Sequence, residues 1–302
     1  MHFCISSRVF GRCLLVASIT AICLATASAS AAEPIAGAMK AGEERAFGSL
    51  KMKFCWCPAG KFTMGSPVDE AGRREDEDQV NVTLTQGFWL GKTEVTQGQW
   101  KAVMSTTPWK GKEYVKEGSD YPAVFVSWED AMSFCQKLTE KERSAGRLQR
   151  DWEYTLPTEA QWEYGCRGGT RTRYSFGDDA DELSRHAWFK DNAWDIGAKY
   201  AHEVEKKLPN AWKLYDMHGN VWEWCRDRYT EKLPGGDNPE VRSKGSLRVL
   251  RGGGWSSSAG YCQSGDRYGY YPSFRFNFLG FRVAQVSLPV KKPASGAKSD
   301  SR

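Results

Sequence analysis

A glycine-rich stretch late in the chain contains the residues with the clearest chemical potential. It reads RGGGWSSSAGYCQSGDR, from Arg251 to Arg267, and it carries three consecutive serines and one cysteine, Cys262. A thiolate is a nucleophile and a soft metal ligand, and a neighbouring arginine lowers the pKa of a thiol. Three interpretations of Cys262 therefore stand: a reactive thiol, one half of a disulfide bond, or a small buried hydrophobic residue.

Six cysteines and three histidines follow residue 32. In an oxidising compartment an even number of cysteines permits disulfide bonds, although their spacing does not reveal which ones pair. The histidines, His186, His202 and His218, fit no zinc-binding pattern. The six cysteines are Cys55, Cys57, Cys135, Cys166, Cys225 and Cys262.

The N-terminal segment has the pattern of a secretory signal peptide. Arg8 and Arg12 precede an apolar stretch over 14–26, and small residues follow it up to Ala32. That stretch is shorter than the roughly 20 residues that a membrane span needs. We therefore predict a signal peptide over 1–32 and an exported protein, periplasmic or secreted, with no membrane span.

The rest of the chain divides into a short linker, one domain and a tail. We predict the linker over 33–47, the domain over 48–286 and a polar, disordered tail over 287–302. The formal net charge is +5, and part of this excess lies in the signal segment and the tail. The folded part is then near neutral, so we expect neither nucleic acid nor a membrane surface as a partner, and we expect a monomer.

The composition indicates a loop-rich domain with an aromatic core. The chain contains 13 Trp, 12 Tyr, 14 Phe and 30 Gly, and few long periodic stretches. Capping boxes at 96–99, 127–130 and 158–161 predict the starts of three short helices. An acidic run, DEAGRREDEDQ over 69–79, is expected to form a solvated loop, with a cation or peptide site as the alternative. Strands are expected in KFTMGS, VNVTLTQGFWLGKTEV, SLRVLRGG and GFRVAQV.

Seven stretches, in order along the chain, resemble the formylglycine-generating enzymes, also called sulfatase-modifying factors. The resemblance runs from about Phe54 to Val283 and so covers nearly the whole domain. It implies an α+β fold that is irregular, loop-rich and similar to C-type lectins. The stretches are FTMGS, FWLGKTEVTQGQW, YPAVFVSWEDAMSFCQKL, LPTEAQWEYGCRGG, PNAWKLYDMHGNVWEW, RVLRGGGW and NFLGFRV.

The resemblance implies where an oxidative site would lie. Aerobic members hold Cu(I) between two cysteines about five residues apart, since two soft thiolates favour that ion. The second of these positions falls on Cys262, but the first falls on Ser257. A hydroxyl oxygen is a poor ligand for Cu(I), so copper is not expected. Cys262 remains the candidate catalytic residue, with Ser257 in the place of its missing partner.

The resemblance also implies a structural calcium ion, bound by hard oxygen ligands. Glu223 would be the side-chain ligand, with backbone oxygens from the turn at 218–221, including those of Asn220 and Val221. The alternative is a buried glutamate paired with a core arginine. A second site would begin at Asn192 and Ala193, although the aspartate expected downstream of them has no clear match.

Two functions follow from this sequence. The first is an oxidoreductase of the formylglycine-generating type, which would modify a cysteine or serine of a sulfatase or another peptide. The second is a calcium-stabilised protein that binds a peptide or a glycan without chemistry. In both cases Trp255, Tyr261 and Arg267 are the predicted ligand contacts, and Tyr268 and Tyr270 are further candidate walls of a cleft, because rigid aromatic rings give contact area at low entropic cost.

Overall fold

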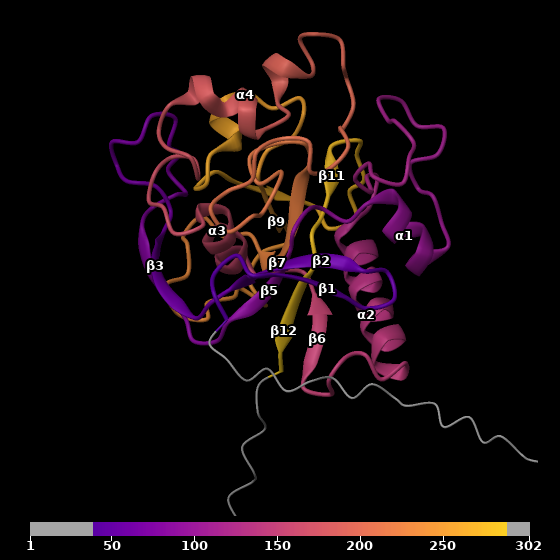
Figure 1. The fold of residues 1–302 in the computed structure, drawn as a ribbon. Coiled ribbons are helices and arrows are strands. Elements are labelled where there is room, and N and C mark those ends of the chain that lie inside the picture. Colours follow the sequence, from indigo (N-terminus) through magenta and orange to yellow (C-terminus); the bar gives the residue numbers. More distant parts are fainter. Residues whose placement is uncertain (1–38, 289–302) are drawn as a thin grey trace, which may run out of the picture. The chain divides into compact units, whose positions relative to one another are not determined.

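The computed structural model describes residues 39–288, and Figure 1 shows their arrangement. The predicted signal peptide and most of the predicted tail lie outside this part of the chain. Within residues 39–288 no helix is long and apolar enough to cross a membrane. The described residues form a mixed α+β, loop-rich structure, which confirms the predicted fold class. The likeness to C-type lectins stays a prediction.

Twelve short strands and four α-helices, with three single turns of 3-10 helix, make up the described residues. The strands are β1 (Glu44–Phe47), β2 (Met52–Cys57), β3 (Gly60–Met64), β4 (Val80–Leu84), β5 (Phe88–Gly91), β6 (Trp152–Thr155), β7 (Trp222–Arg228), β8 (Gly236–Asp237), β9 (Arg248–Arg251), β10 (Arg267–Tyr270), β11 (Leu279–Gly280) and β12 (Ala284–Ser287). The α-helices are α1 (Gln97–Met104), α2 (Trp128–Ser144), α3 (Glu159–Arg167) and α4 (Leu183–His186), and the 3-10 turns are Ala180–Glu182, Lys190–Asn192 and Ala259–Cys262.

The twelve strands form three sheets. The first has five strands in the order β1-β2-β5-β12-β6, the second has the order β10-β9-β7-β11, and the third has the order β3-β4-β8. The last strand, β12, lies antiparallel between β5 and β6, so the two ends of the domain share one sheet (Figure 1). Because β1 pairs with β2 from Glu44 onward, the predicted linker over 33–47 is too long. Likewise the domain continues to Ser287, which pairs with Trp152.

The three helix starts predicted from capping boxes are confirmed. Thr96, Ser127 and Thr158 each accept a hydrogen bond from the backbone N–H three residues on, and that residue's side chain accepts one from the backbone N–H of the cap. This pairing satisfies two backbone donors that a helix N-terminus otherwise leaves free. Helix α3 ends at Gly168, whose φ of +56° suits glycine. The predicted aromatic core is also confirmed: the largest fully buried side chains begin with Trp89, Trp162, Trp224 and Trp255.

Helix α2 closes the outer edge of β6. The hydroxyl of Thr139 accepts a hydrogen bond from the Tyr154 N–H at 2.9 Å and donates one to the Tyr154 carbonyl at 3.2 Å. Arg143 donates to the Trp152 carbonyl at 2.7 Å. Side chains of one helix thus satisfy the backbone groups that an edge strand leaves unpaired, which prevents pairing with another chain.

We expect Thr139→Val to destabilise the domain. Valine keeps the shape of threonine but leaves the buried N–H and C=O of Tyr154 unpaired, which costs about 1–3 kcal/mol. Urea titration would measure the loss in the free energy of unfolding. Gln136→Ala, an exposed change on the same helix, should stay within about 0.5 kcal/mol of wild type. Equal stability of the Thr139→Val variant and wild type would contradict this role.

Candidate functional site

The four-stranded sheet separates two kinds of side chain on its two faces. Side chains alternate between the faces of a sheet along each strand. Residues Trp224, Leu250 and Tyr268 are paired across β7, β9 and β10, so they share one face. Their neighbours Glu223 and Arg251, together with Arg267 opposite Arg251, share the other face.

The first face forms the floor of an aromatic cleft of about 440 Å³. Trp222 and Tyr268 have ring centroids 6.0 Å apart, and Trp222 and Tyr261 have theirs 6.4 Å apart. Tyr261 and Tyr268 remain 41% and 42% exposed, so the rings can contact a ligand. The cleft is lined by Lys190, Trp222, Leu250, Ser256, Ser257, Ser258, Tyr261, Tyr268, Tyr270 and Phe278.

Ser257 lies in the wall of this cleft. Its hydroxyl oxygen accepts a hydrogen bond from the Gly254 N–H at 3.0 Å and another from Trp222 Nε1 at 3.1 Å. The backbone carbonyl of Ser257 accepts from the Lys190 N–H at 2.9 Å. The position at which the resemblance places the missing cysteine therefore faces the cleft, and its hydroxyl orients the indole of Trp222.

Cys262 does not face the cleft. Its side chain is fully buried in a small hydrophobic cluster with Tyr174, Leu183, Ala187 and Phe189. Burial raises the pKa of the thiol well above its ordinary value. The thiol is not in a disulfide bond, and the same holds for the other five cysteines of the described chain, all of them buried. Of the three interpretations, the structure matches the small buried hydrophobic residue and not the reactive thiol.

Of the three other predicted ligand contacts, only one lies in the cleft. Tyr261 lines the cleft. Trp255 is buried and does not line the cleft; its ring stacks on that of Trp194 at 5.6 Å between centroids. Arg267 points to the opposite face of the sheet, where it forms two hydrogen bonds with Glu159 at 2.7 and 2.8 Å. The predictions for Trp255 and Arg267 are thus corrected: both are core residues.

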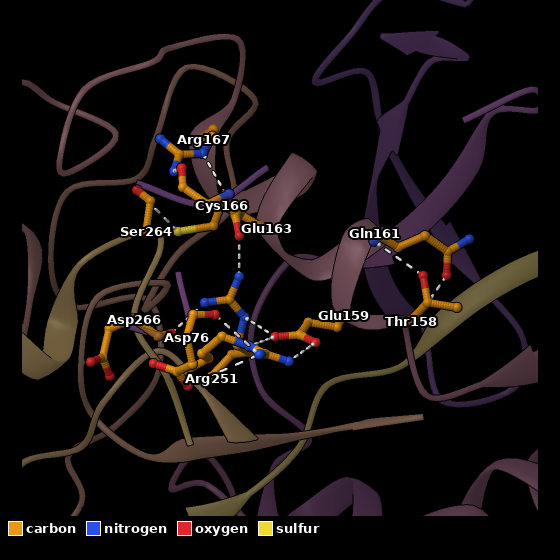
Figure 2. Close-up of polar contacts among 12 residues, drawn as sticks. Asp76, Thr158, Glu159, Gln161, Glu163, Cys166, Arg167, Arg251, Ser264 and Asp266 are labelled. Atoms are coloured by element: carbon orange, nitrogen blue, oxygen red, sulfur yellow. Dashed lines mark hydrogen bonds and ion pairs between the residues drawn. The ribbon is translucent and has the colours of Figure 1, made fainter. Parts of the chain in front are cut away.

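A network of buried ion pairs occupies the second face of the sheet (Figure 2). The guanidinium of Arg251 lies between Glu159 and Glu163, two residues of α3, and hydrogen-bonds to Glu163. Arg167, one turn along the same helix, donates to Glu163 at 2.8 Å. Burial alone would raise the pKa of Glu163, but Arg167 and Arg251 hold it below the ordinary value. Because each of these charges has a partner of opposite sign, the charges can be buried.

A cysteine and a histidine that sequence reasoning did not connect meet in the core. Cys166 Sγ lies 3.9 Å from His218 Nε2 and 3.8 Å from Ser264 Oγ. His218 Nε2 accepts from the Ser175 N–H at 3.1 Å, so Nδ1 carries the proton and donates to the Cys262 carbonyl at 2.8 Å. Burial raises the pKa of Cys166 to about 12 and lowers that of His218 to about 4. The pair is therefore neutral at pH 7 and does not form the thiolate of a catalytic Cys–His pair.

Glu223, the predicted calcium ligand, is already paired. Both of its oxygens accept hydrogen bonds from Arg282 at 2.6 Å, and one also accepts from Trp162 Nε1 at 2.8 Å. All three side chains are buried. This matches the alternative, a buried glutamate paired with a core arginine, so both side-chain oxygens of Glu223 are already engaged. The backbone oxygens of the 218–221 turn stay predicted ligands.

Two neighbouring carboxylates, missed by sequence reasoning, have free oxygens instead. Glu94 Oε2 and Asp216 Oδ1 are buried without a hydrogen-bond partner. Burial, then the charges of Asp216 and Glu223, raise the pKa of Glu94 far above its ordinary value. Burial raises the pKa of Asp216 to about 6. Glu94 also accepts from the Asn220 amide at 3.1 Å. Both acids lie inside stretches that carry the family resemblance, and this was the sequence signal by which they could have been found.

This acidic pair fits either a shared proton or a hard cation. Three buried carboxylates, Glu94, Asp216 and Glu223, face the single arginine Arg282. Within residues 39–288 no three His, Cys, Asp or Glu side chains converge closely enough to hold a metal by themselves. A calcium ion here would therefore draw part of its coordination from backbone oxygens, which calcium accepts readily.

The residues of the second predicted calcium site, Asn192 and Ala193, form the end of a 3-10 turn. Asn192 Oδ1 accepts from the Phe189 N–H at 2.9 Å, and its amide nitrogen donates to the Ala187 carbonyl at 2.8 Å. Ala193 is buried and donates its N–H to the Phe189 carbonyl at 2.9 Å. The side chain of Asn192 thus closes the 3-10 turn beside the cleft residue Lys190. An ion at Asn192 and Ala193 stays a prediction.

Comparisons with known proteins agree with the fold and the motifs. Residues 44–286 match the family described as "Sulfatase-modifying factor enzyme 1-like domain". The mouse formylglycine-generating enzyme is 26% identical over 77% of this chain and 75% of that protein. A protein of Paenibacillus barcinonensis named "Chaperone protein LppX" is 30% identical over 73% of this chain and 79% of that protein.

A solved structure matches the fold over the same region. PvdO from Pseudomonas aeruginosa superposes with a TM-score of 0.71 and 28% sequence identity, covering 82% of this chain and 99% of that one. The family match spans more than three quarters of the sequence and includes every sheet described above. The protein therefore belongs to the sulfatase-modifying factor family.

Proposed function

We propose that this protein holds an extended peptide in its aromatic cleft and does not oxidise it. The observation that carries the proposal is the chemistry of the cleft wall. Within the described residues no cysteine lines the cleft: Ser257 stands where a cysteine would be needed, and Cys262 is buried. What the cleft offers a ligand is aromatic surface, three serines, Lys190 and the backbone around them.

Copper does not fit these residues. Cu(I) selects soft sulfur donors, and a hydroxyl oxygen does not replace one. The Ser257 oxygen is moreover occupied by two hydrogen bonds, and the Cys262 thiol keeps its proton because burial raises its pKa. The oxidative alternative would require Cys262 to leave its cluster and reach the cleft.

A peptide is favoured over a glycan by the outer strand of the sheet. β10 pairs only with β9 among the described strands, so no described strand occupies its other edge. Tyr268 and Tyr270 of the same strand point into the cleft. A free strand edge beside pockets for alternate side chains is the combination by which folded domains bind extended peptides.

The names of the relatives are compatible with binding as well as with catalysis. One relative is named for generating formylglycine and another is named a chaperone protein, at similar identity to this chain. Function on one fold depends on the site and not on the fold, and the site of this chain favours binding.

We also propose that a structural calcium ion is bound at the buried acidic pair. Glu94 Oε2 and Asp216 Oδ1 would be ligands, and the ion would neutralise the excess charge of the three carboxylates around Arg282. Carboxylate oxygens are hard ligands of the kind that calcium prefers. Export, inferred from the signal-like residues 1–32, would place the protein where calcium is available.

The cleft can be tested with a fluorescent peptide that contains a Cys-x-Pro-x-Arg segment, with and without added copper. We expect binding by anisotropy and no change in the peptide's mass. Tyr268→Ala should weaken binding about 10-fold, the effect of losing one aromatic contact at the centre of an interface. Tyr271→Ala, an exposed tyrosine outside the cleft lining, should leave the affinity unchanged.

Three results would count against the peptide proposal. An altered peptide mass that Cys262→Ala abolishes would establish the oxidative alternative. Retention of glycans without retention of peptides would assign the cleft to sugars. Equal peptide affinity of the Tyr268→Ala and Tyr271→Ala variants would place the binding site elsewhere.

Elemental analysis of the purified protein tests the calcium proposal. We expect bound calcium in the wild type and its loss in Asp216→Asn, because the amide removes one charged ligand. Asp227→Asn is the matched control: Asp227 is equally buried, but its two oxygens already accept from the N–H groups of Glu159 and Val241. Unchanged calcium content in Asp216→Asn would refute the assignment.

Without calcium, the same acid should make stability depend on pH. The folded state raises the pKa of Asp216 to about 6, above the ordinary value of about 3.9. Its contribution to stability is therefore fully present below about pH 4 and is lost as the pH rises through about 6. Urea unfolding in EDTA should show this decrease in the free energy of unfolding, and Asp216→Asn should reduce it. An identical pH profile for the variant and wild type would contradict the shift.

A further inference from the structure

The acidic loop between β3 and β4 is not the solvated loop that its composition suggests. Asp69, Glu75 and Asp78 are exposed as expected, but Ser66 and Glu77 are fully buried. The loop folds against the segment 263–266, which follows Cys262. Solvation of the exposed residues therefore does not explain why Glu77 is buried.

Buried oxygens without a hydrogen-bond partner concentrate at this contact. The described residues contain eight such side-chain oxygens, and five of them lie on the loop or on 263–266. Nearly all buried polar groups in proteins are hydrogen-bonded, so a group of unpaired acceptors calls for a partner. The five atoms are Ser66 Oγ, Glu70 Oε1, Glu77 Oε2, Gln263 Oε1 and Asp266 Oδ2.

Gly265 lets two of these oxygens approach its backbone closely. A Cβ atom at this position would clash with Ser66 Oγ and lie 3.2 Å from Glu77 Oε2. Burial raises the pKa of Glu70 and that of Glu77. The Ser66 hydroxyl lies beside both carboxyl groups and lowers these pKa values. One hydroxyl proton can satisfy only one of two carboxylates.

The nearby cations are engaged elsewhere. Arg73 donates to the Ser66 carbonyl at 3.2 Å and pairs with Asp78. Arg74 pairs with Asp266 at 3.3 Å. Neither guanidinium is hydrogen-bonded to the unpaired oxygens. Arg167 and Arg173 lower the pKa of Glu70, and Arg251 lowers that of Glu77, but burial outweighs them and both pKa values stay raised. A bound cation would add the positive charge that these arginines do not supply.

We propose that Ser66, Glu70 and Glu77 bind a calcium ion beside Gly265. The donors are a hydroxyl and two carboxylates, with the buried Gln263 amide oxygen on the facing segment, and all are the hard oxygen ligands that calcium takes. With only two charged ligands, the dissociation constant should be about 10⁻⁴–10⁻³ M, as in extracellular modules. This site is separate from Glu94 and Asp216, and it does not depend on the proposed peptide binding.

The ion would hold one wall of the aromatic cleft in place. The guanidinium of Arg74 lies over the ring of Tyr261 at 4.7 Å and over that of Tyr268 at 5.8 Å. Gln263 Nε2 donates to the Ala71 carbonyl at 3.0 Å, which ties the same loop to the segment behind the cleft. Cation binding at Ser66 and Glu77 would thus fix the loop that positions Arg74 against two cleft tyrosines.

Limited trypsin digestion reports on this loop directly, because Arg73 and Arg74 offer adjacent cleavage sites in it. Calcium at about ten times the dissociation constant should slow cleavage there about 10-fold in the wild type, since binding stabilises the closed loop. Fragment masses identify the cut. Glu77→Gln should remove the calcium effect, and so should Gly265→Ala, whose methyl group would displace the Ser66 hydroxyl.

Asp216→Asn is the matched control, because it alters the other proposed ion site and should keep the calcium protection of the loop. Near-ultraviolet circular dichroism checks that each variant is folded, and Ser66→Ala replaces Glu77→Gln if that variant is not. Cleavage of the wild type that calcium does not slow would overturn the proposal. So would protection that Asp216→Asn abolishes and Glu77→Gln keeps, since the effect would then come from the other site.

Discussion

The structure depends on charges that are buried in pairs. Three arginines, Arg251, Arg267 and Arg282, are fully buried. Removing a single member of such a pair would leave an uncompensated charge in a medium of low polarity, at a cost of about 3–5 kcal/mol. The pairs of Arg251 and Arg267 therefore hold α3 against β9 and β10 in one register, and the pair of Arg282 ties β7 to the segment before β12. Their partners are Glu159, Glu163 and Glu223.

The aromatic cleft is the other consequence of that register. Because side chains alternate along a strand, the residues next to the paired charges must point the opposite way. Trp222, Leu250 and Tyr268 are those neighbours, and they form the floor of the cleft. A slip of one residue would place the charges in the cleft and the rings in the core, and the buried ion pairs exclude it. The ion pairs thus shape the cleft without touching a ligand.

Burial also decides the chemistry of the sulfur atoms. Each of the six cysteines in the described chain is buried and unpaired, and none lines the cleft. For Cys262 the surrounding Tyr174 and Phe189 replace the solvent that would stabilise a thiolate. Carboxylates buried with unpaired oxygens lie instead at two other places, around Asp216 and around Glu77. The two proposed calcium ions would be bound by such oxygen ligands, and the cleft is lined by aromatic rings, three serines and Lys190.

The sequence by itself determined the family, the helix starts and the identity of the donor at position 257. A capping box needs only residues three positions apart, and a serine lacks a thiol in any conformation. Tertiary structure alone decided that Cys262 turns inward, that Arg267 points away from the cleft and that Glu223 already has a partner. Arg267 directly precedes Tyr268 in one strand, and neighbouring side chains in a strand point to opposite faces. The orientation of Arg267 therefore followed once the face of Tyr268 was known. Burial and ion pairing are set by segments far apart in the chain, such as Glu223 and Arg282, and spacing along the sequence does not carry that information.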